Sequence, residues 1–283
     1  MSSATPTGLP LGSAELHQAF EDGMAAIRAA ERHITSQNAG WHRKVKKREH
    51  DFVTDLDLEV ERVMRSVLTD SNHMGAKLVG EEFGGSRELG SGCYWVMDPI
   101  DGTTNVLRSI PSFTVTLALV VDGRPVVGIV SAPMFRERYT AVVGEGAYVE
   151  AGELRTPLHA SGVTDLAGSL VSINDIYSVS DAGDRRRAGR ITGALAERTL
   201  QIRCHGSIGL DMAWVAAGRL EACIAFSNRP WDVLAGALLV QEAGGCVFDG
   251  EGRPHDLSST LAIGSSTLVR DELVAVLGAA RLG

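Results

Sequence analysis

The stretch that decides the fold is Tyr94-Trp95-Val96-Met97-Asp98-Pro99-Ile100-Asp101-Gly102-Thr103-Thr104-Asn105. It predicts an apolar strand that ends in two aspartates, because Pro99 fixes its own φ and cannot donate a ladder hydrogen bond. Gly102 permits a tight turn, after which a threonine can cap a helix. Carboxylate oxygens suit Mg²⁺, and free backbone N–H groups suit phosphate. A plain strand–turn–helix junction with capping residues explains the same pattern.

Acidic residues also stand at the ends of three other predicted elements. Glu81-Glu82 follows a short apolar run, Thr54-x-x-Asp57 has the spacing of a capping box, and Asp232 opens a predicted helix. Taken singly, each has a structural explanation: an acidic turn, a helix cap, a second helix cap. Together with the aspartates of the first stretch, they predict a metal site built where elements end.

The rest of the chain divides into two patterns. In the first half, apolar spacing predicts helices and an antiparallel meander whose hairpin turns at Asp122-Gly123. These elements are helices over 13–34 and 55–68 and strands over 114–121, 124–132, 137–143 and 147–149. In the second half, strands over 169–173, 201–204, 221–226, 246–248 and 261–263 alternate with helices over 184–198, 208–217, 232–243 and 268–279.

This organisation predicts a disordered leader over 1–12, an α+β half over 13–155 and an α/β half over 156–283. The leader is rich in Ser, Thr, Pro and Gly and lacks the pattern of an export signal. No Pro/Gly/Ser linker separates the two halves, which indicates one compact unit.

The composition excludes several classes of protein. Of the 283 residues, 44% are hydrophobic and 22% are charged, as in ordinary globular proteins. The net charge of −8 argues against a nucleic-acid partner, which would require a basic face. No apolar run approaches the ~18 residues of a membrane span. We therefore expect neither a nucleic-acid nor a membrane partner.

The four cysteines are scattered and lack the spacing of a zinc site. They are predicted to be free thiols in apolar segments, which suits a reducing cytoplasm. None of the eight histidines has a convincing catalytic context.

Four segments, in this order along the chain, resemble the signature segments of the inositol monophosphatase family. They are residues 51–57, 80–82, 98–105, and 231–232 followed by 241–245. The resemblance covers nearly the whole chain after the leader. It implies a layered αβαβα sandwich, dependence on two to three Mg²⁺ ions, sensitivity to lithium and a homodimer.

The resemblance also implies roles for individual residues. The metal ligands would be Glu81, Asp98, the Ile100 carbonyl, Asp101 and Asp232, with Asp57 at an outer position that helps hold a third ion. Thr103 and Glu81 would orient and activate the attacking water, so that these two residues and Asp57 form the implied catalytic set. The backbone N–H groups of Gly102 and Thr103 would hold the phosphate. Lys46 matches a lysine on the family's mobile entrance loop, although a solvated cation is the simpler interpretation.

Substrate contacts are implied at Gly102, Thr103, Gly206, Ser207, Ile208, Ala225 and Asp232. Ala225 matches the glutamate that holds inositol hydroxyls in the family, and its side chain cannot accept a hydrogen bond. We therefore expect a less polar, uncharged substrate group at this wall. Asp211, Asn228 and Arg229 are polar candidates for replacing the missing contact, and a subunit interface would explain Arg229 equally well.

The predicted function is Mg²⁺-dependent hydrolysis of a small, inositol-phosphate-like monoester. Two metal ions ~3.5–4 Å apart can bridge the phosphate, lower the pKa of a bound water and stabilise the leaving oxygen. The alternatives are a histidinol-phosphate phosphatase, a phosphatase of an aminocyclitol or nucleoside phosphate in secondary metabolism, and a regulatory family member without catalysis.

Overall fold

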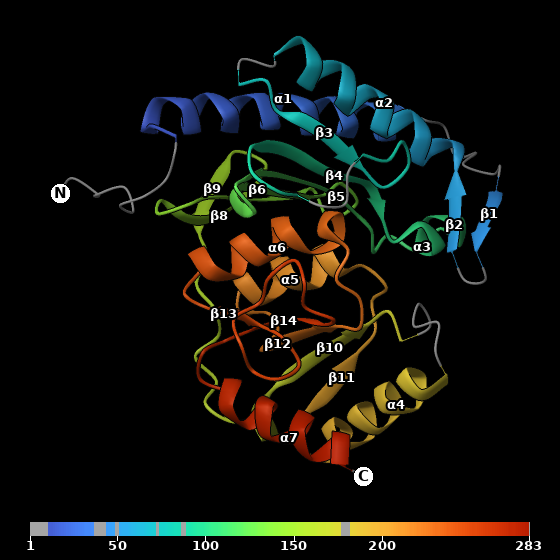
Figure 1. The fold of residues 1–283 in the computed structure, drawn as a ribbon, viewed down its shortest axis with the longest axis vertical. Helices are drawn as coiled ribbons and strands as arrows, with labels where there is room; N and C mark the ends of the chain where they lie inside the picture. The colour runs from blue at the N-terminus through green and yellow to red at the C-terminus, as the bar shows by residue number, and fades with distance from the viewer. Residues whose placement is uncertain are drawn as a thin grey trace.

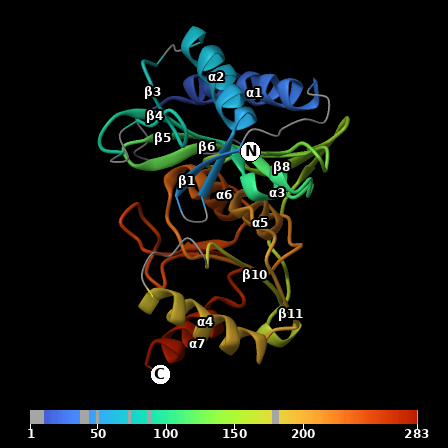
Figure 2. The same cartoon turned by 90° about the vertical axis from the view of Figure 1, so that its right-hand side faces the viewer.

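The computed structural model describes residues 11–36, 44–48, 51–71, 74–85, 89–176 and 182–282. The chain forms five layers, which Figure 1 shows stacked along the long axis and Figure 2 shows from the side. From one end these are α1 (Ser13–Ser36) with α2 (Asp55–Asp70), a seven-stranded sheet, α5 (Ile208–Ala216) with α6 (Pro230–Glu242), a five-stranded sheet, and α4 (Ala182–Ala196) with α7 (Arg270–Leu282). The expected layered αβαβα fold is confirmed.

The seven-stranded sheet runs in the order β3-β4-β5-β6-β7-β8-β9. Its strands are β3 (Lys77–Gly80), β4 (Cys93–Asp101), β5 (Thr114–Val121), β6 (Arg124–Ala132), β7 (Glu137–Val142), β8 (Gly146–Ala151) and β9 (Leu154–Pro157). Only β3 and β4 pair in parallel; the other pairs are antiparallel. Every residue of β5 is buried, because helices cover both faces of the sheet, and this explains the continuous apolar run.

The predicted hairpin is present with its predicted bounds. Asp122 has a φ of 48° and Gly123 a φ of 77°, the left-handed pair that two-residue hairpin loops favour.

The strand ends that matter for the site are those of β3 and β4, which lie side by side because the two strands are parallel.

The five-stranded sheet runs in the order β11-β10-β12-β14-β13. Its strands are β10 (Leu170–Asn174), β11 (Gln201–Arg203), β12 (Ala222–Ala225), β13 (Cys246–Phe248) and β14 (Ala262–Ser265). β10 pairs in parallel with β11 and β12, whereas β14 pairs antiparallel with β12 and β13. One cluster of buried apolar residues joins strands of both sheets through α5 and α6. The division into halves at 155/156 stays a prediction.

Three strands were not predicted from the sequence. β1 (Lys44–Arg48) pairs antiparallel with β2 (Asp51–Thr54), which leads directly into α2. β1 was missed because its run of basic residues shows no apolar alternation. β9, the third missed strand, is exposed at all four positions and so has no apolar face to detect. The side chain of Lys46 and residues 1–10 of the predicted leader lie outside the described residues. Among the helices described, none is both long and apolar enough to cross a membrane.

Candidate metal and phosphate site

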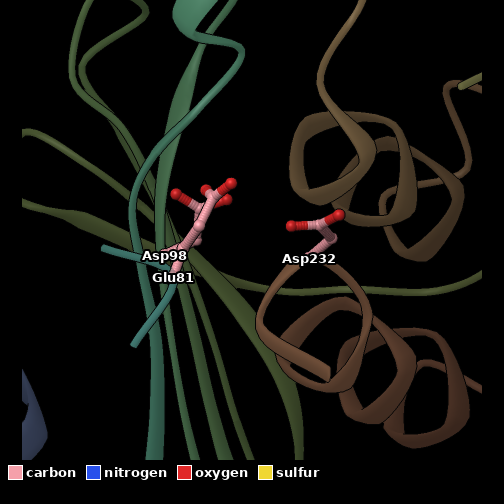
Figure 3. Close-up of side chains that lie close together, drawn as sticks. All are labelled: Glu81, Asp98 and Asp232. Carbon is pink, nitrogen blue, oxygen red and sulfur yellow. The ribbon is translucent and has the colours of Figure 1, made fainter. Parts of the chain in front are cut away.

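Three carboxylates from different elements meet at one point. Glu81 follows β3, Asp98 lies in β4, and Asp232 is in the first turn of α6. One ligand atom from each lies within 4.8 Å of the others, and Figure 3 shows Glu81 and Asp98 facing Asp232 across the site. Asp98 is 2% exposed and Asp232 5%. Within the described ranges, this is the one such group of acidic, histidine or cysteine side chains.

The electrostatics of the cluster favour a cation. Burial, followed by the charges of Glu81 and Asp232, raises the pKa of Asp98 well above its usual range. Burial likewise raises the pKa of Asp232, against the opposing charge of Arg229, whose guanidinium lies 3.9 Å from the Asp232 carboxylate. Carboxylates forced together in this way are stabilised by a divalent ion, and hard oxygen donors suit Mg²⁺. The donor set therefore fits magnesium.

Asp101 is held by the start of α5. Its Oδ2 accepts hydrogen bonds from Ser207 Oγ at 2.6 Å, the Gly209 amide at 2.7 Å and Thr114 Oγ1 at 3.0 Å, while Oδ1 accepts from the Ile208 amide at 3.2 Å. Burial raises the pKa of Asp101 to about 6 although these hydrogen bonds oppose it. Asp101 lines the same cleft but is not a member of the three-carboxylate group, so its role as a ligand stays a prediction.

Asp57 combines the two interpretations given to it. It forms the capping box of α2 with Thr54, which is the structural explanation. Its other oxygen, Oδ1, accepts a hydrogen bond from Thr103 Oγ1 at 2.8 Å, and the Ile100 carbonyl lies 3.2 Å from the same hydroxyl. Asp57 is fully buried. It therefore supports Thr103 directly, and its contribution to a third ion stays a prediction.

The turn after β4 requires glycine. Gly102 has a φ of 108°, and a Cβ there would lie 3.1 Å from the carbonyl oxygens of both Gly206 and Ser112. This close approach brings the 102–104 turn against the turn that precedes α5. The side-chain amide of Asn105 links these segments, because it donates hydrogen bonds to the carbonyls of Ser112 and His205.

The cleft around the carboxylates has a volume of about 110 Å³. Most predicted site residues line it: Glu81, Asp98, Ile100, Asp101, Gly102, Thr103, Gly206, Ile208, Arg229 and Asp232. A larger cleft of about 320 Å³ lies between α1 and β7–β8, but it holds no such metal-competent group among the described residues. We therefore place the chemistry in the smaller cleft.

Several residues that were expected to contact the substrate are not among the described residues that line the cleft. Ala225 is fully buried in β12 and is not part of this lining, and a substrate contact at this position stays a prediction. Asp211 is also fully buried and bonds to His205 and Asn174. The side-chain amide nitrogen of Asn228 donates hydrogen bonds to the carbonyls of Asp256 and Ser259. Ser207 does not line the cleft either, and acts through Asp101.

Two acidic residues of the site were missed in the sequence. Glu61 is fully buried in α2 and accepts hydrogen bonds from the amides of Glu82 and Phe83 at 2.8 and 3.2 Å, so it fixes the turn that carries Glu81. Asp175 lines the cleft immediately after β10. Nothing in the sequence distinguishes Glu61 from the other acids of a charged helix. Asp175, by contrast, directly follows an apolar run, and the same position at a predicted strand end was the reason for choosing Asp98. Phe52 and Thr104 complete the lining.

The chain is similar in sequence and in fold to known proteins. The chain is 35% identical over 237 residues to the inositol-1-monophosphatase ImpA of Mycolicibacterium smegmatis, covering 82% of each protein. It is 34% identical over 225 residues to the Nus factor SuhB of Escherichia coli, covering 79% of this chain and 82% of SuhB. Its fold matches an IMPase of Thermotoga maritima with a TM-score of 0.81 at 28% identity, covering 94% of this chain and 98% of that one.

The sequence model of the inositol monophosphatase family matches residues 14–280. The match contains all four signature segments and every carboxylate of the cleft named above. Inositol monophosphatases such as ImpA are phosphoric monoester hydrolases, and so is this chain. With the family's layered fold and its sequence signature both present, the chain belongs to the inositol monophosphatase family.

Proposed function

We propose that the chain hydrolyses a small, inositol-phosphate-like monoester with Mg²⁺ held by Glu81, Asp98 and Asp232. The observation that carries the proposal is the convergence of these three carboxylates within 4.8 Å, two of them buried. Asp101 and the Ile100 carbonyl, which line the same cleft, are the further oxygen donors. Bound Mg²⁺ would neutralise phosphate charge and lower the pKa of water.

The residues of the chain then orient the reactants. Thr103 donates its hydroxyl proton to Asp57, which leaves the lone pairs of Oγ1 available to accept a hydrogen bond from the attacking water. Glu81, which is less buried than Asp98 and Asp232, is the carboxylate that would take up the water's proton. Gly102 and Thr103 line the cleft, and their backbone amides would donate to the phosphate oxygens.

The relatives support the substrate class. ImpA is named an inositol-1-monophosphatase and a Thermotoga maritima relative, 33% identical, a fructose-1,6-bisphosphatase/inositol-1-monophosphatase. SuhB is named a Nus factor, so a regulatory role is the second candidate. The complete set of carboxylates favours catalysis, because a purely regulatory protein has no need of them.

Phosphate release with and without Mg²⁺ tests the proposal. The panel should contain inositol, histidinol, sugar, nucleotide and aminocyclitol phosphates. We expect turnover that EDTA abolishes and that Asp98→Asn and Asp232→Asn each reduce by several orders of magnitude. Asp184→Asn, an exposed acid of α4, is the matched control and should keep full activity. An active Asp98→Asn enzyme would refute the assignment, and Mg²⁺ binding without any turnover would favour the regulatory role.

We further propose a lithium-sensitive homodimer in the cytoplasm. The resemblance to the family supports the dimer and the lithium effect, and four unpaired cysteines support a reducing compartment. Light scattering on the purified chain and inhibition by LiCl are the corresponding measurements.

A further inference from the structure

Asp175 brings a carboxylate into the cleft from the five-stranded sheet. It directly follows Asn174, the last residue of β10, and lines the cleft together with Gly206, Asp101 and Asp232. The preceding residue, Asn174, pairs in register with Ala225. The chain thus lacks an acid at 225 and carries one beside it, on the neighbouring strand.

The backbone and one neighbour present this carboxylate to the cleft. Asp175 has a φ of 62°, a left-handed conformation that aspartate and asparagine tolerate better than most residues. Ser227 Oγ donates to Asp175 Oδ2. The side chain of Asn174, by contrast, is occupied by the Gly206 amide and Asp211. Asp175 is therefore the residue of this strand end that can meet a substrate.

The charge of Asp175 has no protein counterion in the described part of the chain. The described residues that line the cleft include five carboxylates and one guanidinium, that of Arg229, which lies 3.9 Å from Asp232. The partner of Asp175 is a neutral hydroxyl. Burial is the main cause that raises the pKa of Asp101 and of Asp232, and the charge of Asp175 raises both further.

We propose that Asp175 binds an ammonium group on the organic part of the substrate, so that the preferred ester is an amino-alcohol phosphate. The inference rests on the proposed function, which places the phosphate at the three-carboxylate cluster and the 102–103 turn, in the cleft that Asp175 also lines. A hydroxyl also donates a hydrogen bond to a carboxylate, but an ammonium group adds Coulomb attraction to Asp175, which pairs with no cationic side chain among the described residues.

Three esters that differ in one terminal group test the inference: 3-aminopropyl, 3-hydroxypropyl and butyl phosphate. The native enzyme should prefer the amino ester over both others in kcat/KM by about tenfold or more, the value of one charge-assisted hydrogen bond. Asp175→Asn and Asp175→Gly, both compatible with a positive φ, should bring the ratios close to one. Asp122→Asn, at another left-handed aspartate in an exposed turn, is the matched control and should keep them.

Binding separates this inference from the proposed function. The affinities of 3-aminopropylphosphonate and butylphosphonate, measured by calorimetry with Mg²⁺ present, should show the same Asp175-dependent preference. If neither these esters nor p-nitrophenyl phosphate is hydrolysed while the binding preference persists, the proposed function fails and the inference stands. The inference is overturned if the native enzyme has equal kcat/KM values for the amino and hydroxyl esters, or if the preference for the amino ester is unchanged in both Asp175 variants.

Discussion

At the scale of single residues, structural and functional roles coincide more often than they compete. Asp57 caps α2 with one oxygen and holds the Thr103 hydroxyl with the other. Sequence reasoning set these interpretations against each other because a local pattern shows only the local partner. Thr103 is 46 positions away, and no spacing rule links the two residues.

The first prediction concerns Thr103. Replacement by alanine removes the hydroxyl that would orient the water, a contact that matters mainly in the transition state, so kcat should fall and KM change little. One preorganised catalytic group is worth ~2–4 kcal/mol of barrier. Thr103→Ser keeps the hydroxyl and should recover most of the rate. Steady-state kinetics decide it, and a Thr103→Ala protein that mainly loses thermal stability would show a structural role instead.

Of the five carboxylates that line the cleft, four were predicted from the sequence, namely Glu81, Asp98, Asp101 and Asp232, whereas Asp175 and the supporting Glu61 were missed. Each of the four lies at or close to the end of an element, and that position marked them. Glu61 lies inside an ordinary charged helix, and its function depends on amides that are 21 and 22 positions away. Contacts of this kind exist only in the folded chain.

At the scale of elements, the site depends on how strand ends are fixed. β3 ends at Gly80, and the following turn is tied by its amides to the buried Glu61 carboxylate, which also accepts from Arg65 Nε at 2.7 Å. Gly80 makes this possible, because a Cβ there would lie 2.0 Å from Glu61 Oε1.

Gly80→Ala is therefore expected to be harmful. The added methyl group must displace the Glu61 carboxylate from its three donors, and overpacking of this kind costs about 1–3 kcal/mol. Because Glu81 is the next residue, Mg²⁺ affinity should fall along with the free energy of unfolding. Denaturant unfolding and metal titration measure the two effects. Gly90→Ala, with open space around its Cβ, should change neither, and a Gly80→Ala protein with native metal affinity would contradict this role of Glu61.

Element bounds were predictable where local signals were strong. β5 and β6 were predicted residue for residue, because an apolar run, a left-handed turn and a second apolar run leave little choice. β1 was missed because a run of lysines and arginines has no apolar face to detect. Its pairing with β2 depends on the partner strand rather than on its own composition.

At the scale of the whole molecule, the site requires that the layers keep their spacing. Glu81 and Asp98 belong to the seven-stranded sheet, and Asp232 belongs to α6, which packs against that sheet. The order of these layers could not be read from periodicity, which describes one element at a time. It was predicted only through the family resemblance.

An ion pair between layers should give the molecule a specific acid sensitivity. Arg219, just after α5, donates to both carboxylate oxygens of Glu137 in β7, at 2.7 and 2.8 Å. Hydrogen bonds from Arg219 are the main cause that holds the pKa of Glu137 below its usual value. A lowered folded-state pKa means stability that is present above the unfolded pKa and lost as the pH falls through the folded one.

Arg219→Gln should therefore unfold more readily than the native chain at pH 7, by no more than about 1 kcal/mol because the guanidinium is partly exposed. The difference should shrink as the pH falls below the ordinary range of a glutamate. Urea unfolding of both proteins between pH 7 and pH 3 tests this. A difference that stays constant with pH would assign the effect to the hydrogen bond that Arg219 donates to the Tyr139 hydroxyl instead.

The spacing between α6 and the sheet rests on a row of small residues. Ala118, Gly128, Ala141 and Ala147 stand opposite one another on β5, β6, β7 and β8, and α6 passes so close that a Cβ on Gly128 would lie 2.7 Å from the Ala235 carbonyl oxygen. That oxygen is backbone and cannot rotate away, so Gly128→Ala must push the helix and the strand apart.

We expect Gly128→Ala to lower the free energy of unfolding by about 1–3 kcal/mol. It should also weaken Mg²⁺ binding, because Asp232 moves with α6 while Asp98 stays on β4. Gly193→Ala is the contrasting variant: this exposed position inside α4 has open space around it, and alanine there should stabilise the protein by about 0.5–1 kcal/mol. If Gly128→Ala loses stability but binds Mg²⁺ as tightly as the native chain, the carboxylate cluster tolerates a displaced α6, and the layer spacing does not control the site.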